Sequence, residues 1–177
     1  MNNSKTSQDK AFIKLIKERI VNTSIGSSTL RGQRRGSAKT AREYLYKINL
    51  SELKGIEQLE FIKWLNHHTE ILSKKLHHNW GAARKSLNIF LFEASQNIHL
   101  SKRYDLIKII PFFETPLDNH AAKTLINKER KLWRSIKSLT KENSDKIQSY
   151  AEEYAKKEKL KARCYSDLKL WRRKERL

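Results

Sequence analysis

Apolar side chains recur along much of the chain at the three- and four-residue spacing that places them on one face of a helix. Segment 9–21 shows this spacing first, with Phe12, Leu15, Ile16 and Ile20 expected to face inward. Similar patterns predict further helices over 38–49, 56–76, 79–98, 118–127, 128–139 and 145–173. Ser37 is expected to cap the second helix. In the third, the positions expected to face inward are Leu59, Ile62, Leu65, Leu72 and Leu76.

The predicted helix over 79–98 is the most apolar of the set. Its middle, from Leu87 to Phe92, leaves almost no polar face, which marks a central, buried helix. Segment 104–118 follows it and contains both prolines of the chain, Pro111 and Pro116. We expect this segment to be an extended apolar connection packed on the core, with a short strand at 106–110 as the alternative.

These elements predict an all-α fold of about seven helices, in a single compact domain over residues 1–177. Residues 1–54 carry 12 basic and 4 acidic side chains, residues 55–127 carry 9 and 7, and residues 128–177 carry 17 and 8. We therefore expect the nearly neutral part 55–127 to form the apolar core. The basic N-terminal part and the basic C-terminal helices are then expected to contact a polyanion.

The net charge of +19 makes a nucleic acid the expected partner. A field of this sign attracts DNA or RNA and releases the counterions bound to it. An anionic membrane surface fits less well, because the basic segments are not flanked by strongly apolar helix faces. An acidic protein is a further alternative, and the oligomeric state is left open. No apolar run approaches about 18 residues and the N-terminus has no apolar signal core, so we expect neither a membrane span nor secretion.

Cysteine and histidine give no sign of a metal site or a cofactor. Cys164 is the single cysteine, which excludes an intrachain disulfide and a cysteine-based zinc or iron–sulfur site. It fits a reducing, cytoplasmic setting and is expected to be a small, half-buried residue of a helix. The six histidines include two adjacent pairs, His67/His68 and His77/His78, but lack the i, i+4 spacing around an acid that zinc-binding helices use.

Segment 22–37, NTSIGSSTLRGQRRGS, holds three of the five glycines and is expected to be a loop. It matches neither of the common glycine-rich phosphate-binding patterns. Its glycines permit close approach to a ligand, and the guanidinium groups of Arg31, Arg34 and Arg35 suit phosphate oxygens. We expect this loop to contact a nucleic-acid backbone; the alternative is a flexible loop in solvent.

Two residues of the middle part suggest a catalytic hypothesis. Lys85 falls in the first turns of the most buried helix, where loss of hydration lowers the pKa of an amine. A neutral amine is a nucleophile that can form a Schiff base. Asp118 follows Pro116 at a predicted helix start, where backbone N–H groups favour an ionised carboxylate. Such a carboxylate can stabilise a developing oxocarbenium ion, so the pair supplies the two groups that a base-removing enzyme needs.

The pattern Pro-x-Asp-x-His-x-x-Lys, formed by Pro116, Asp118, His120 and Lys123, resembles the Asp segment of helix-hairpin-helix DNA glycosylases. The preceding segment ARKSLNIFLFEA and its apolar link are most similar to the archaeal 8-oxoguanine glycosylase branch. The resemblance covers residues 80–127, and it implies that Lys85 attacks the sugar C1′ while Asp118 assists. The Leu-Pro-Gly-Val-Gly hairpin of that superfamily and its cluster cysteines are not in the sequence.

Both residues also have a structural interpretation. Asp118 fits a helix N-cap, and Lys85 fits a helix lysine whose charged end reaches solvent or a phosphate. The hypotheses are therefore a DNA glycosylase/AP lyase and a non-catalytic nucleic-acid-binding module, as in mobile-element or phage accessory proteins. The residues expected to contact nucleic acid are Arg31, Arg34, Arg35, Lys39, Arg84, His120, Lys123, Arg172 and Arg173.

Overall fold

The computed structural model describes residues 2–26, 29–126 and 129–170, and all regular structure in these ranges is helical. This confirms the all-α class, with nine α-helices in the described residues where about seven were predicted. The α-helices are α1 (Asn2–Ser24), α2 (Ser37–Lys47), α3 (Gln58–Lys75), α4 (Trp80–Gln96), α5 (Ile98–Tyr104), α6 (Leu106–Ile109), α7 (Asn119–Ile126), α8 (Lys141–Lys157) and α9 (Ser166–Leu170). Short 3₁₀ turns lie at Leu50–Leu53, Ile110–Phe112, Arg130–Leu132, Ile136–Ser138 and Arg163–Tyr165.

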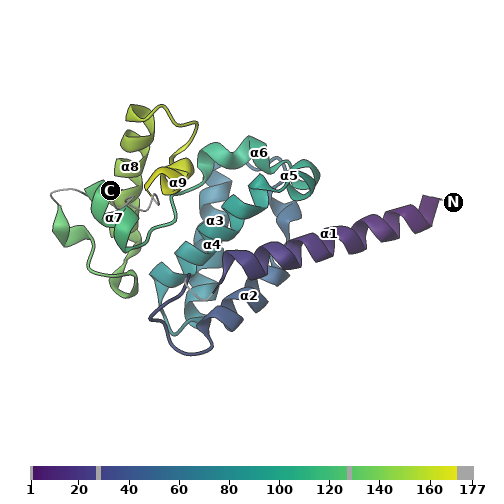
Figure 1. Ribbon diagram of the computed structural model, residues 1–177, viewed down its shortest axis with the longest axis horizontal. Helices are drawn as coiled ribbons and strands as arrows, with labels where there is room; N and C mark the ends of the chain where they lie inside the picture. Colours follow the sequence, from purple (N-terminus) through teal and green to yellow (C-terminus); the bar gives the residue numbers. More distant parts are fainter. Residues whose placement is uncertain (1, 27–28, 127–128, 171–177) are drawn as a thin grey trace, which may run out of the picture.

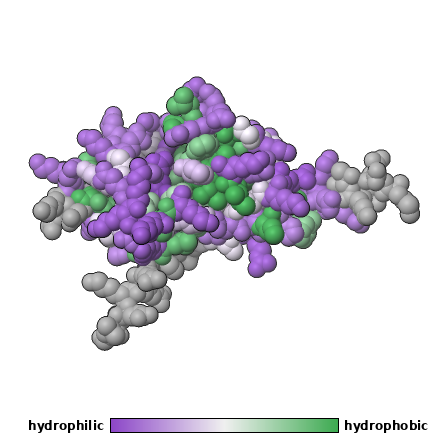
Figure 2. Space-filling view, turned by 90° about the horizontal axis from the view of Figure 1, so that it is seen from above, coloured by the Kyte–Doolittle hydropathy of each residue, from purple (hydrophilic) through white to green (hydrophobic). Residues whose placement is uncertain are grey.

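Helix α4 is central, as its apolar composition predicts. Helices α1, α2, α3 and α5 pack against it, and Leu87 and Phe90 have no exposed surface. The surrounding helices can be followed in Figure 1, where α7, α8 and α9 lie together on the side away from the N-terminus. Figure 2 shows a mostly hydrophilic face with hydrophobic side chains gathered near its middle.

The interior consists of two hydrophobic clusters. The first is built by α1 to α6 and includes Ala162 and Cys164; the second is built by Leu117, α7, α8, α9 and the segment around Trp133. Ile136 packs against both clusters. The clusters meet closely at the start of α4, because a Cβ atom on Gly81 would collide with the carbonyl oxygen of Ile136. Only glycine permits this approach of the two backbones.

The core extends beyond residues 55–127, so that part of the prediction was too narrow. Ile25 and Leu45 of the basic N-terminal part are fully buried, as is Ile147 of the basic C-terminal part. The physical reason is that charge on the outer face of an amphipathic helix leaves its inner face free to pack. The net charge of a segment therefore indicates how charged its exposed face is, and not how much of the segment is buried in the core.

The inward faces of two helices were assigned partly wrongly. Phe12 and Leu15 are 50% and 63% exposed, because the N-terminal part of α1 extends beyond the other helices (Figure 1). In α3, Leu59 is 72% exposed and Ile62 is 38% exposed. That helix packs instead through a face that contains Phe61, Leu65, Leu72 and Leu76, all of which are buried.

Several boundaries also differ from the prediction. Residues 104–112 are mostly helical, with neither a strand nor an extended segment, and the extended backbone begins only at Phe113. Within 129–139 the chain forms two 3₁₀ turns separated by extended residues Trp133 and Ser135, where one helix was expected. The predicted last helix is divided, because the chain turns at Lys159, whose φ is 54°. Gly36, with φ of 91° and no side-chain cap, precedes α2, so Ser37 is its first residue and not its cap.

Within the described residues, none of the helices is both long and apolar enough to cross a membrane.

Candidate functional site

Lys85 lies in the second turn of α4, half-buried, and reaches the glycine- and arginine-rich loop. Its Nζ donates a hydrogen bond to the carbonyl oxygen of Thr29 over 3.2 Å. Burial lowers the pKa of the Lys85 amine, while the carboxylates of Asp118 and Asp167 act in the opposite direction. A lowered pKa increases the neutral, nucleophilic fraction of an amine near neutral pH.

Asp118 caps α7, which confirms the structural part of its prediction. Its Oδ1 accepts hydrogen bonds from the backbone N–H groups of His120 and Ala121, each over 2.8 Å. The carbonyl oxygen of Asp118 accepts the first bond of the helix from Ala122. The side chain is half-buried. Two N–H donors thus fix one oxygen of the carboxylate at the positive end of a helix.

A buried ion pair connects the segment that carries Asp118 to the helix that carries Lys85. Nε and Nη2 of Arg84 donate to the two carboxylate oxygens of Glu114 over 2.8 and 2.7 Å. Asn88, one turn further along α4, donates to Glu114 over 3.1 Å. Burial would raise the pKa of Glu114, but Arg84, Asn88 and the more distant Arg163 lower it below its usual value.

The remaining nitrogen of Arg84 is also engaged. Nη1 donates to Oδ1 of Asn66 and to Oγ1 of Thr69, over 2.9 and 3.0 Å, and the guanidinium lies 5.3 Å from the Trp80 ring centroid. Arg84 is only 3% exposed. Arg84 was expected to contact nucleic acid, but the structure places its guanidinium inside the protein, where Glu114, Asn66 and Thr69 accept its hydrogen bonds.

The other side of this segment is held by the C-terminal part of the chain. The backbone N–H of Thr115 donates to Oε1 of Gln148, and Nε2 of Gln148 donates to the carbonyl oxygen of Thr115, over 2.9 and 2.8 Å. The Thr115 hydroxyl donates to the carbonyl of Arg163, whose Nε donates to the carbonyl of Phe113. The extended residues before Asp118 are thus anchored to α4 on one side and to α8 and its following turn on the other.

Asp167, on α9, is a third ionisable group of this site and was not predicted from the sequence. Burial raises the pKa of its carboxyl to about 6, with further contributions from Asp118 and Glu93 that raise it and one from Lys85 that lowers it. No local sequence signal marks Asp167, because its neighbours in the site come from distant parts of the chain. Glu114 had a signal: it is a carboxylate within an otherwise apolar segment.

The arginine-containing loop lies against the turn between α3 and α4. Nη1 of Arg34 is 3.5 Å from Nδ1 of His77, and Nδ2 of Asn79 donates to Oε1 of Gln33 over 2.5 Å. Arg31, Arg34 and Arg35 are exposed. Together with the Lys85–Thr29 hydrogen bond, these contacts bring the loop next to the start of α4.

The remaining predicted contact residues are distributed as follows. Lys39 is exposed on α2 and lies 3.9 Å from Glu43. His120 and Lys123 are exposed on α7, beside Asp118. Arg172 and Arg173 lie outside the described residues.

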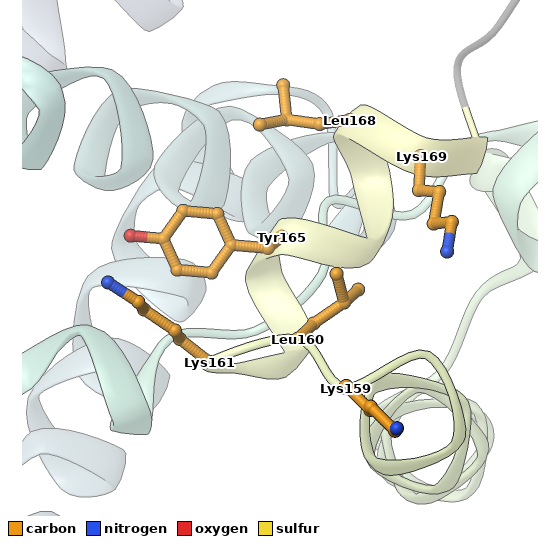
Figure 3. A pocket seen from close by; sticks show the side chains of 6 residues that line it. All are labelled: Lys159, Leu160, Lys161, Tyr165, Leu168 and Lys169. Carbon is orange, nitrogen blue, oxygen red and sulfur yellow. The ribbon is translucent and has the colours of Figure 1, made fainter.

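Three surface pockets of the described part of the chain have linings that do not include Lys85 or Asp118. One of them, with a volume of about 420 Å³, is shown in Figure 3. Tyr165 and Lys161 extend from its wall in the same direction. Its lining residues are Lys159, Leu160, Lys161, Tyr165, Leu168 and Lys169. Within the described ranges, no group of three or more histidine, cysteine or acidic side chains is placed to hold a metal ion.

No protein-family model matches the chain, and no curated protein and no solved structure matches it.

Proposed function

We propose that the protein binds DNA and removes a base from it as a DNA glycosylase/AP lyase, with Lys85 as nucleophile and Asp118 as charge stabiliser. The observation that carries the proposal is that a half-buried lysine on α4 and an aspartate fixed by two backbone N–H groups at the start of α7 stand on segments joined by a buried ion pair. The carboxylate of Asp118 is one of the groups that act on the pKa of Lys85. Lys85 belongs to the helix at the centre of the first cluster, and Asp118 opens the first helix of the second. The buried Arg84–Glu114 pair fixes the two segments to each other.

The chemistry uses the neutral fraction of Lys85, which the lowered pKa of its amine increases, and the carboxylate of Asp118. The neutral amine of Lys85 attacks C1′ of the nucleoside, and the base departs with the electron pair of the glycosidic bond. Asp118 stabilises the positive charge that develops on the sugar, and its two N–H donors keep the carboxylate in position. The sugar ring then opens as a proton moves from the lysine nitrogen to O4′, which leaves an imine. The imine makes a C2′ proton acidic, so that the 3′ phosphate can be eliminated.

The charge distribution supports DNA as the substrate. The protein carries a net charge of +19, and its arginine-rich loop lies next to Lys85 through the hydrogen bond to Thr29. Exposed arginines bind phosphate oxygens and release counterions. Contacts from this loop would place the backbone of a DNA strand beside the amine.

Replacing Arg34 and Arg35 together by alanine should weaken DNA binding for all sequences. The slope of log K against log salt should become shallower by about 2, since each phosphate contact contributes about 0.9 for duplex DNA. This slope is measured by fluorescence anisotropy of labelled DNA at several salt concentrations. The matched control replaces Lys102 and Lys108, exposed on α5 and α6, with the same loss of charge. Equal effects of both pairs would contradict a specific role for the loop.

Borohydride trapping tests the catalytic part of the proposal. Borohydride reduces the imine to a stable secondary amine, which links the protein to DNA. Wild-type protein should be trapped on duplexes with an abasic site. Lys85→Gln should abolish trapping and leave DNA affinity nearly unchanged, since it removes one of 38 basic side chains. The control Lys102→Gln, exposed on α5, should be trapped like wild type. If wild-type protein is trapped neither on abasic DNA nor on oxidised, alkylated and deaminated substrates, the proposed glycosylase/AP lyase activity is refuted.

A second candidate function is a nucleic-acid-binding module without catalysis. One observation favours it: Lys85 and Asp118 already have structural partners, in Thr29 and in the start of α7. This candidate predicts salt-dependent binding without any trapped complex, so the two experiments above separate the candidates.

A further inference from the structure

Two surface pockets adjoin each other where the outer half of α1 meets α5. One has a volume of about 750 Å³ and the other of about 300 Å³. Ile13 of α1 and Arg103 of α5 belong to the linings of both, so the pockets form one continuous surface. We call it the α1–α5 surface. It lies where α1 projects beyond the other helices in Figure 1.

The larger pocket is the apolar half of this surface. Phe12 and Ile98 line it from the two helices and are 50% and 73% exposed. The ring of Phe12 packs edge-on against the ring of His99, with centroids 5.1 Å apart, which holds the two helices together at this point. Asp9 and Lys102 complete its polar lining. Figure 2 shows hydrophobic side chains exposed on the narrow part of the molecule that leads to the N-terminus.

The smaller pocket is the cationic half. Its described lining contains four basic side chains and no acidic one; the basic residues are Lys10, Lys14, Lys17 and Arg103. Within the described residues, no carboxylate oxygen lies within 4.0 Å of any of these four cations. Their charges are therefore available to an anionic ligand.

Lys17 is a fixed cation of this half. Its Nζ donates hydrogen bonds to the carbonyl oxygen of Tyr46, over 2.6 Å, and to that of Ile48, at the end of α2. It also lies 5.7 Å from the centroid of the Tyr46 ring. An ammonium group has three N–H donors, so one of them remains for an acceptor outside the protein.

The combination of the two halves indicates what kind of partner fits. Exposed apolar side chains that share one pocket gain free energy when another apolar surface covers them. Unpaired cations beside that pocket favour carboxylates on the same partner. A second copy of this chain fits poorly, because each copy carries a net charge of +19. Nucleic acid fits poorly as well, because the aliphatic side chain of Ile98 neither stacks on a base nor binds a phosphate.

We propose that the α1–α5 surface docks an acidic amphipathic helix of another protein. The apolar face of that helix covers Phe12 and Ile98, and its carboxylates face Lys14, Lys17 and Arg103. The arginine-rich loop begins after Ser24, which follows Phe12 by 12 residues on α1, or about 18 Å along the helix axis. The surface is therefore separate from the proposed DNA contacts, and this inference does not depend on the proposed function.

A synthetic peptide tests the partner chemistry. The probe is a fluorescein-labelled helical peptide of leucine, alanine and glutamate, with the leucines on one face and the glutamates on the other. One comparison peptide has the same composition in scrambled order, and another has glutamine in place of glutamate. Fluorescence anisotropy should show that the acidic amphipathic peptide binds at least about tenfold more tightly than either comparison, because only it matches both halves of the surface.

An apolar substitution tests the place of binding. Ile98→Ala should weaken peptide binding about tenfold, because alanine lacks the methyl and methylene groups that the partner covers. The matched control is Leu59→Ala on α3, since Leu59 is 72% exposed and lies outside this surface. Both sites are exposed, so both variants should keep the wild-type melting temperature. Neither change should alter affinity for duplex DNA.

A charge substitution tests the cationic half. The double variant Lys14→Gln, Arg103→Gln should also weaken peptide binding about tenfold, by removing two of the cations that face the carboxylates. Its control, Lys74→Gln with Lys75→Gln, removes the same charge from exposed positions at the end of α3 and should bind the peptide like wild type. Hydrogen exchange supplies an independent measurement, because the amides of residues 8–17 should exchange more slowly when the peptide is bound.

Each other outcome contradicts the inference. Equal binding of the amphipathic and scrambled peptides would show attraction by net charge alone. Equal effects of Ile98→Ala and Leu59→Ala would place the peptide elsewhere. A loss of DNA affinity in the Ile98→Ala variant would make this surface a nucleic-acid interface. Binding to phosphatidylserine vesicles but not to the peptide would make it a membrane contact, and a wild-type dimer that Ile98→Ala dissociates would make a second copy the occupant.

Discussion

Glu114→Ala is expected to lower the free energy of unfolding by about 3–5 kcal/mol, because it leaves the buried guanidinium of Arg84 without its anion. Glu114 and Arg84 are 7% and 3% exposed, so water cannot replace the lost partner. Urea denaturation followed by circular dichroism measures the change.

A surface pair provides the matched control. Glu60 and Lys63 are 2.8 Å apart, but both side chains are exposed. Glu60→Ala should change the free energy of unfolding by no more than about 1 kcal/mol. The double variant Arg84→Met, Glu114→Leu should recover much of the loss, because no unpaired charge remains. A Glu114→Ala protein as stable as wild type would contradict the assignment of this pair as the connection between the two segments.

The same ion pair gives the protein a definite acid sensitivity. Since the folded state lowers the pKa of Glu114, the folded protein binds this proton less well than the unfolded chain does. The contribution of the pair is complete above the ordinary carboxyl pKa of 4.5 and is lost as the pH falls through the lower folded value. This part of the acid sensitivity should be absent from the Arg84→Met, Glu114→Leu variant.

Asp118→Asn is expected to reduce the rate of base excision by about 10²–10³-fold, the usual cost of removing one group that stabilises a transition-state charge. Asparagine also accepts the two N–H bonds of the cap, so the melting temperature and DNA affinity should stay close to those of wild type. Single-turnover excision measures the rate. Asp118→Ala is the control for the cap, and it should lose about 0.5–2 kcal/mol of stability in addition. If the Asp118→Asn protein excises bases at the wild-type rate, Asp118 has no catalytic role and serves only as the N-cap of α7.

The helices follow from the sequence because helical periodicity is a local property. The dense apolar run of α4 predicts its central place, since Phe90 and Phe92 point to nearly opposite sides of the helix and both are buried. The outer half of α1 could not be predicted in the same way. Phe12 and Leu15 have the spacing of inward residues, but both are exposed, and Phe12 is covered only in part, by His99 of α5. Whether a helix face is buried depends on which element packs against it, and the periodicity of the sequence gives no information about that partner.

The same distinction between local and long-range contacts decides which parts of the candidate site could be predicted from the sequence. The cap at Asp118 could be predicted because its hydrogen bonds go to residues two and three positions further on. The role of Arg84 could not, since its partner Glu114 is 30 residues away. Asp167 needs the complete fold, because α9 reaches the start of α7 only after α8 has returned the chain.

The two hydrogen bonds between Gln148 and Thr115 restrict which residue can occupy position 148, and this restriction indicates how relatives of this protein could be recognised from their sequences. The buried amide donates to one backbone group and accepts from another, and only glutamine has this pairing at this side-chain length. Glutamate would place two acceptors there, and leucine would leave both backbone groups unpaired. Arg84, Asn88 and Glu114 are constrained in a similar way by their partners. A distant homologue with the same site should therefore keep these polar identities while its apolar residues exchange freely, so a search profile should weight the polar positions most.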